Sequence, residues 1–156
     1  MLNNFLDQQT ITMIWNLSLA AVLGMAIGFE REHRRKPAGL RTYTLVALGA
    51  ALFTAISIAV YNIFPSISGV SGYDYHLVAN IVVGIGFIGG GLIFMRGGHM
   101  EGLTTAAGLW ATAAVGMAAG FGLYAVAIYA TILVLFILWA MRSLENVIHK
   151  DDAPRI

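Results

Sequence analysis

The stretch Gly84-Ile85-Gly86-Phe87-Ile88-Gly89-Gly90-Gly91 places five glycines among eight otherwise apolar residues. A glycine in a helix interior costs roughly 1 kcal/mol relative to alanine. Membrane helices accept this cost where two backbones approach closely, because lipid provides little hydrophobic force between helices. After a short polar turn, the chain enters a second run of small residues that extends past Trp110. The pattern predicts a close-packed helical hairpin in a membrane.

The composition agrees with a membrane protein. The chain has 156 residues, of which 58% are hydrophobic and 11% charged, and its mean hydropathy is +0.77. A soluble domain carries roughly 25% charged residues, so this chain lacks the polar surface that water requires. The sequence contains no cysteine, which excludes disulfides, thiolate metal sites and cysteine nucleophiles.

Five apolar segments divide the chain, each near the roughly 20 residues that span a bilayer. They cover residues 11–29, 43–64, 77–95, 103–119 and 123–141. These segments predict an all-α, polytopic membrane protein with five transmembrane helices. We expect an extracytoplasmic N-terminus at residues 1–10, one transmembrane domain at residues 11–141, and a cytoplasmic tail at residues 142–156.

The basic residues indicate the orientation. With five spans, all nine lysines and arginines lie on the same side of the membrane. Cytoplasmic loops carry the excess of basic residues, so we predict an N-out, C-in topology. None of the five segments contains a charged residue or a histidine. Such residues within a membrane usually mark an ion or proton path, so their absence weakens the case for a pump.

An internal repeat is suggested by two similar motifs. Gly39-Leu40-Arg41-Thr42 precedes the second segment, and Gly102-Leu103-Thr104-Thr105 begins the fourth. Both close a basic turn, so the halves would be parallel two-helix repeats about an axis normal to the membrane. Small residues also match by chance, and the two explanations remain open.

Small residues at a spacing of four form stripes along single helix faces. Such stripes are typical of close helix packing, within one protomer or between protomers, and we expect a homo-oligomer. The alternative is that the glycines of the third segment break the helix and expose carbonyls to a permeating ion. The stripe residues are Gly24, Gly28, Gly86, Gly90, Gly108, Thr112, Gly116 and Gly120.

A charged run follows the first segment, at residues 30–36. Its basic residues can anchor the chain on anionic headgroups, at about 1 kcal/mol each. The alternative is a docking surface for a cytosolic or membrane partner. Arg41 lies beyond the run and could pair with Glu30 or Glu101. The candidate charge network comprises Glu30, Arg31, Arg34, Arg35, Lys36, Arg41 and Glu101.

Asp74 and Asn80 lie at the outer end of the third segment. Hard cations such as Mg²⁺ prefer oxygen ligands, so these two residues are candidates for an outer ion mouth. Aspartate is also a favoured helix cap, and that role for Asp74 is the alternative. The sequence establishes no cofactor and leaves a metal undetermined. It contains no P-loop, serine elbow or HExxH motif, so we expect no enzyme. We also expect no nucleic-acid binding, because the basic cluster is short and lies against the bilayer.

Two blocks of the sequence resemble the signatures of the MgtC/SapB family of bacterial membrane proteins. The first is Gly28-Phe29-Glu30-Arg31-Glu32 followed by residues 36–42, and the second is residues 84–91 with residues 102–110. The resemblance covers about residues 11–141. The motif positions outside the charge network are Gly39, Leu40, Thr42, Gly102, Leu103, Thr105 and Trp110.

The resemblance implies a multi-pass inner-membrane protein linked to magnesium limitation, acid stress and, in some pathogens, virulence. Larger family members carry a soluble C-terminal domain, and we expect this chain to hold the transmembrane part alone. The family tends to have arginine and glutamine where His76 and Asn80 stand. Our leading hypothesis is a non-enzymatic protein that acts through other inner-membrane proteins. The alternatives are a transporter or channel for Mg²⁺ or another small solute, and a lipid-organising scaffold.

Overall fold

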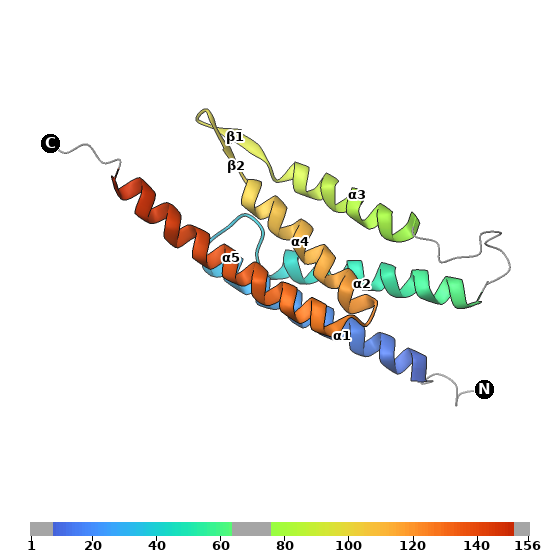
Figure 1. The fold of residues 1–156 in the computed structure, drawn as a ribbon. Coiled ribbons are helices and arrows are strands. Elements are labelled where there is room, and N and C mark those ends of the chain that lie inside the picture. The colour runs from blue at the N-terminus through green and yellow to red at the C-terminus, as the bar shows by residue number, and fades with distance from the viewer. Residues whose placement is uncertain (1–7, 64–75, 152–156) are drawn as a thin grey trace.

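The computed structural model describes residues 8–63 and 76–151, and within them the chain forms five helices and one short hairpin (Figure 1). Helices α1 (Gln8–His33) and α2 (Leu40–Ile63) come first. They are followed by α3 (His76–Gly91), the strands β1 (Phe94–Arg96) and β2 (His99–Glu101), and then α4 (Leu103–Gly120) and α5 (Tyr124–Asp151). The all-α, polytopic fold expected from the apolar segments is confirmed.

The third segment differs from its prediction, because its helix ends before Met95. The amides of Leu92 and Ile93 donate to the carbonyls of Gly89 and Gly90, at 3.1 and 3.3 Å, which tightens the last turn. Three consecutive glycines favour this early end, since glycine is a poor helix former. Phe94 and Met95 then enter a two-stranded antiparallel hairpin instead of continuing the helix.

The hairpin turns at Gly97 and Gly98, which both have positive φ angles, of 58° and 84°. Two-residue loops with positive φ at both positions match the right-handed twist of paired strands, and glycine adopts them without steric cost. The strand side chains are exposed. The expected polar turn is therefore a projecting β-hairpin.

Among the described residues, four helices are long and apolar enough to cross a membrane: α1, α2, α4 and α5. The apolar part of α3, Val78–Gly91, is shorter. At about 1.5 Å per residue it extends roughly 21 Å, against about 30 Å of hydrocarbon. The prediction of five spans therefore stays a prediction for α3. Helix α5 also continues past Met141, to Asp151.

Helices α1, α2 and α4 form the interior of the bundle. Helix α2 packs against both α1 and α4, while α3 lies on α4 and α2, and α5 lies on α4 and α1. The largest fully buried side chains all come from this trio: Tyr43, Ile27, Leu109, Val115, Thr54 and Thr112. Small residues dominate the rest of the core, so the three backbones approach closely.

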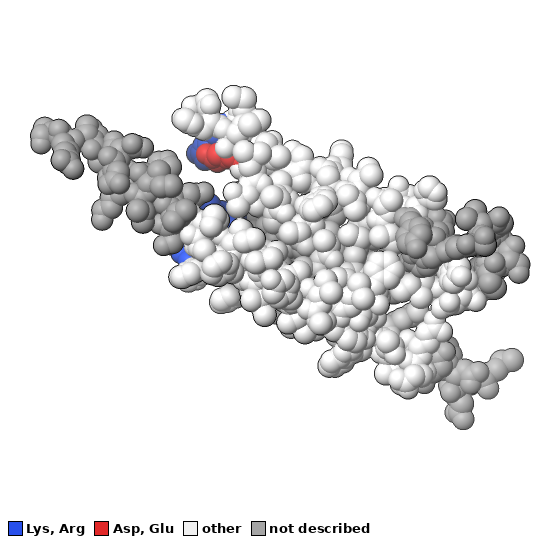
Figure 2. Space-filling view, viewed as in Figure 1, with Lys and Arg blue, Asp and Glu red and all other residues white. Residues whose placement is uncertain are grey.

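The charged side chains gather at one end of the bundle. The C-terminal ends of α1 and α5, the starts of α2 and α4, and the hairpin all lie there (Figure 1). On the face shown in Figure 2, blue and red atoms appear at this end and the rest of the described surface is uncharged. We call it the basic end, defined by Arg31, Arg34, Arg35, Lys36, Arg41 and Arg96. Its clustering fits the predicted orientation, which remains to be measured.

The two repeated motifs occupy equivalent positions. Helix α2 begins after Gly39 and α4 begins after Gly102. The Gly39 carbonyl accepts from the Tyr43 amide at 3.1 Å, and the Gly102 carbonyl accepts from the Ala106 amide at 2.9 Å. Both motifs therefore start a helix with the same first hydrogen bond, at the basic end.

Candidate functional site

The small-residue stripe of α4 lies directly against α2. A β-carbon added to Gly120 would lie 2.9 Å from the Ala51 carbonyl oxygen, and one added to Gly116 would overlap the Ala47 carbonyl. Such distances do not occur between real side chains and backbone. Thr112, between these glycines and Gly108, is buried and donates its hydroxyl to the Gly108 carbonyl at 2.8 Å. The α2–α4 interface therefore has no room for larger residues.

Helix α1 uses its own glycine pair against the same stretch of α2. A β-carbon on Gly24 would lie 2.6 Å from the Ala47 side chain, and one on Gly28 would lie 2.9 Å from Leu40 Cα and from Tyr43 Cβ. Tyr43 is thus enclosed between Gly28 on one side and Gly108 on the other.

Gly86 and Gly90 lie elsewhere. Both are exposed, and an added β-carbon would meet no atom within 4 Å. Within α3 it is Gly89 that faces α4, with Ala106 at 3.4 Å from the added carbon. Packing of Gly86 and Gly90 against a second protomer stays a prediction.

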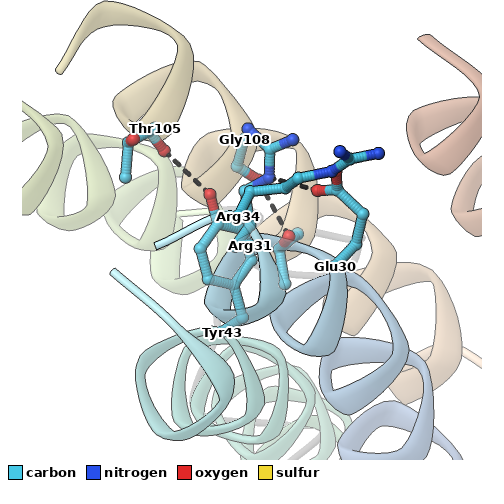
Figure 3. A network of polar contacts seen from close by, with 7 residues as sticks. Glu30, Arg31, Arg34, Tyr43, Thr105 and Gly108 are labelled. Atoms are coloured by element: carbon cyan, nitrogen blue, oxygen red, sulfur yellow. Dashed lines mark hydrogen bonds and ion pairs between the residues drawn. The ribbon is translucent and has the colours of Figure 1, made fainter. Parts of the chain in front are cut away.

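Tyr43 connects this interior to the basic end. Its hydroxyl donates to the Thr105 carbonyl at 3.2 Å, across the α2–α4 interface. Figure 3 shows this bond next to the side chains of Glu30 and Arg31 from α1 and of Arg34 from the turn that follows it. The contact brings residues from three helices together at the point where the core meets the charged surface.

Glu30, Arg31 and Arg34 form a compact charged cluster. Arg31 is only 3% exposed, and its Nε donates to Glu30 Oε2 at 2.5 Å. Arg34 Nε lies 3.5 Å from the other carboxylate oxygen, Oε1. One carboxylate therefore serves two guanidinium groups, and the cluster keeps a net positive charge. A buried charge is tolerated only when it is paired, so Glu30 is required for Arg31 to lie where it does.

The cluster also retains unused hydrogen-bonding capacity. Glu30 Oε1 and Arg34 Nε are buried, and neither forms a hydrogen bond with another described group. Their separation of 3.5 Å is an ion-pair distance with poor hydrogen-bond geometry. Buried polar atoms without partners are uncommon in folded proteins, which marks this cluster as a candidate site.

The turn after α1 presents two further basic residues. Its Lys36 and Arg35 amides donate to the carbonyls of Arg31 and Glu32, at 3.1 and 2.9 Å. These are the two bonds of a Schellman motif, whose left-handed position is usually glycine. Here Arg35 occupies it, with φ of 54°. Arg35 and Lys36 are exposed.

The predicted pairing of Arg41 differs from the observed one. Glu30 pairs with Arg31 and Arg34, while Arg41 is exposed and forms no ion pair with any described residue. Glu101 is likewise exposed on β2 and unpaired within the described chain. The reason is geometric, since Glu30 points along α1 toward its own helical neighbours.

The remaining predicted residues do not join the cluster. Asp74 lies outside the described residues, and Asn80 is exposed on α3. The described residues contain no group of three or more side chains suited to holding a metal ion. Among the motif positions, Thr105 is buried, Leu103 and Trp110 are exposed, and Gly39 lies under the Glu32 carboxylate.

Sequence reasoning missed the capping role of Glu32 and the roles of Tyr43, Asn16 and Tyr124. Glu32 accepts the Leu40 amide at 2.8 Å and so caps the start of α2 from the end of α1. At the opposite end, Asn16 donates to the Gly120 carbonyl at 3.2 Å and accepts the Tyr124 hydroxyl at 2.7 Å. A lone amide within an apolar run was the available signal for Asn16, because a polar group in lipid needs a partner.

The chain is similar to known proteins over most of its length. The chain matches the MgtC family over residues 17–147. It is 42% identical over 135 residues to an Escherichia coli K12 protein named "Putative magnesium transporter YhiD", a match that covers 86% of this chain and 63% of that protein. It is 43% identical over 139 residues to "Protein MgtC" of Brucella abortus, covering 89% of this chain and 55% of that one.

A third relative is "Protein MgtC" of Salmonella typhimurium, which is 39% identical over 143 residues. That match covers 92% of this chain and 54% of the relative. The chain thus spans between 54% and 63% of the length of these three relatives. A comparison with solved structures finds no match.

Proposed function

The chain belongs to the MgtC family of membrane proteins, and on that premise we propose that it supports bacterial growth under magnesium limitation by binding a partner protein at the basic end. We place it in the inner membrane as a multi-pass protein. Mild acidity and infection, which the family resemblance implies, are further settings for the same role. The proposal assigns the chain no catalytic step.

The observation that carries the proposal is the exposed pair Arg35 and Lys36. Neither side chain has an ion-pair partner among the described residues. The turn that presents them is fixed by two backbone hydrogen bonds and lies on the buried Arg31–Glu30 pair. A fixed basic surface with unpaired charges favours an anionic surface on a partner, because complementary charge speeds association and selects the partner.

The packing of the interior supports binding over ion passage. Backbone and side-chain atoms of α2 lie against Gly24 and Gly28 of α1 and against Gly116 and Gly120 of α4. These close contacts favour binding over an ion route between the three central helices. Mg²⁺ retains several of its waters and needs oxygen ligands, so it requires far more space than these interfaces contain.

Magnesium transport is the second candidate, and the name of the Escherichia coli relative suggests it. The described residues give this candidate no cluster of three metal ligands. Transport would then require an assembly of several protomers, in which the Asn80 side chains line a shared path.

The test combines complementation with a flux measurement. Arg35→Gly together with Lys36→Gln removes two exposed charges, and glycine suits the left-handed position of residue 35. Arg35→Lys with Lys36→Arg is the matched control, since it keeps both charges. In a deletion strain at low magnesium, we expect the control to restore growth and the neutral variant to fail at equal membrane levels.

Purified wild-type protein in vesicles containing a magnesium-sensitive dye gives the second measurement. We expect Mg²⁺ entry equal to that of protein-free vesicles. Entry above that level, together with full rescue by the neutral variant, would overturn the proposal in favour of transport.

A further inference from the structure

A lateral groove of about 660 Å³ runs between α2 and α3. Leu45, Gly49 and Phe53 line it from α2, and Gly84, Ile85 and Ile88 line it from α3. Its wall is apolar along its length. Polar side chains occur at its ends, with Arg41 and Thr42 at the basic end and Asn80 at the other.

Two glycines keep the groove open. A β-carbon added to Gly49 or to Gly84 would meet no atom within 4 Å. By contrast, a β-carbon added to the core-facing glycines of α1 or α4 would clash with neighbouring atoms. They lie on facing helices, so the side chains of the described residues leave the space between α2 and α3 open.

The length of the groove matches one leaflet of a bilayer. From Arg41 to Phe53 the α2 helix rises roughly 18 Å, at about 1.5 Å per residue. Half of the hydrocarbon core measures about 15 Å. An acyl chain whose headgroup lies at Arg41 would thus reach the Phe53 end, whereas a helix from a second copy would continue beyond it.

The basic end of the groove suits an anionic headgroup. Arg41 is exposed and forms no ion pair with a described residue. It lies in the first turn of α2, where backbone amides and the helix dipole favour negative charge. The Glu32 carboxylate already accepts the Leu40 amide at this helix start, so the attraction of a phosphate rests on the exposed charge of Arg41 itself.

We propose that the α2–α3 groove binds one anionic phospholipid from the leaflet at the basic end, with its phosphate at Arg41 and an acyl chain along Gly49 and Gly84. The proposal is independent of the partner surface at Arg35 and Lys36. It differs from general electrostatic attraction to anionic membranes, because it specifies one binding site that holds both the phosphate and an acyl chain.

Native mass spectrometry of the protein in mild detergent tests the groove with phosphatidylglycerol as the probe. Gly84→Leu fills the groove, while Gly86→Leu is the matched control. Both residues are exposed on α3 with open space beyond them, but only Gly84 lines the groove. We expect Gly84→Leu to lose most of the bound lipid and Gly86→Leu to retain it. Equal retention by both variants would overturn the proposal.

The headgroup contact has its own test. Arg41→Gln should lower the preference for phosphatidylglycerol over phosphatidylethanolamine by about fivefold, as expected for one basic residue at an anionic surface. Arg96→Gln, which removes an exposed basic residue on the hairpin outside the groove, should leave the preference unchanged. Loss of the preference for phosphatidylglycerol in both variants would indicate non-specific electrostatic attraction and contradict a defined binding site at Arg41.

A labelling experiment does not depend on the glycine variants. Because the chain has no cysteine, Leu45→Cys introduces a single thiol at the groove wall. Phe29→Cys, at an exposed position near the basic end of α1, is the matched control, because a thiol at the middle of α1 would lie too deep in the bilayer to react. In vesicles, phosphatidylglycerol should slow maleimide labelling at position 45 but not at position 29. Disulfide-linked dimers through position 45, with no effect of lipid, would instead identify a second copy as the occupant and overturn the proposal.

Discussion

The hydroxyl of Tyr43 occupies the space where a side chain on Gly108 would begin, 2.6 Å from an added β-carbon. The nearest ring carbons of Tyr43 lie 3.5 Å from the same point, which is ordinary contact. The conflict therefore comes from one oxygen atom. That oxygen also donates to the Thr105 carbonyl, so the tyrosine gains a bond across the interface that glycine makes possible.

The first prediction concerns this pair. Gly108→Ala should destabilise the protein by about 1–3 kcal/mol, the usual cost of overpacking. Tyr43→Phe should cost about 0.5–1.5 kcal/mol through the lost hydrogen bond. In the double variant the conflicting oxygen is gone, so its cost should fall clearly below the sum of the two single costs. Unfolding in mild detergent measures all three, and additive costs would contradict the described contact.

The second prediction compares two helical glycines. Gly116→Ala would drive a methyl group into the Ala47 carbonyl and should destabilise by more than about 2 kcal/mol. Gly86→Ala meets open space and should stabilise by about 0.5–1 kcal/mol, because alanine favours the helix. Thermal unfolding of the two variants checks this. Similar effects at both positions would remove the distinction between packed and open glycines.

The third prediction concerns the charged cluster. Glu30→Gln leaves the buried Arg31 guanidinium without a counter-charge and should destabilise by about 3–5 kcal/mol. Glu101→Gln is the control, because Glu101 is exposed on the hairpin, and its effect should stay within about 0.5 kcal/mol. Folded yield in membranes and unfolding in detergent are the measurements. A neutral result for Glu30→Gln would mean that Arg31 finds another partner.

The fourth prediction concerns orientation. Reporter fusions after Gly98 and after Ile156 should be cytoplasmic, and a fusion after Ser68 should be extracytoplasmic. The basis is the clustering of basic residues at one end, together with their bias toward cytoplasmic loops. If the fusion after Ser68 is outside and the fusion after Gly98 is also found outside, α3 does not cross the membrane.

The sequence predicted the long helices well because length and apolar composition are enough to identify them. Apolar runs of sufficient length specify α1, α2, α4 and α5 without reference to any partner. The small-residue stripe of α4 also carried information, since a spacing of four places all its members on one face. The sequence did not indicate which helix the stripe contacts, because its contacts on α2 are Ala47 and Ala51, and alanine occurs in every apolar segment of this chain.

The missed features depend on the geometry of distant residues. Phe94 and Met95 are apolar and continue the third segment by composition, so only the glycines around them indicated a hairpin. The Glu32 cap of Leu40 depends on a tight turn with arginine in a glycine position. Tyr43 has no periodic signal of its own, and its bond to Thr105 joins residues that are 62 positions apart.

Helix α4 contacts each of the other four helices, and this has a consequence for biogenesis. Helices α1 and α2 leave the ribosome first, and until α4 follows, the Tyr43 hydroxyl has no acceptor on Thr105. Of the four long helices, α4 is the least apolar, so it gains least from lipid by itself. We therefore expect α4 to depend on the earlier α1–α2 pair for its place in the membrane, and a chain that ends before Leu103 to leave the α2 face around Tyr43 and Ala47 uncovered.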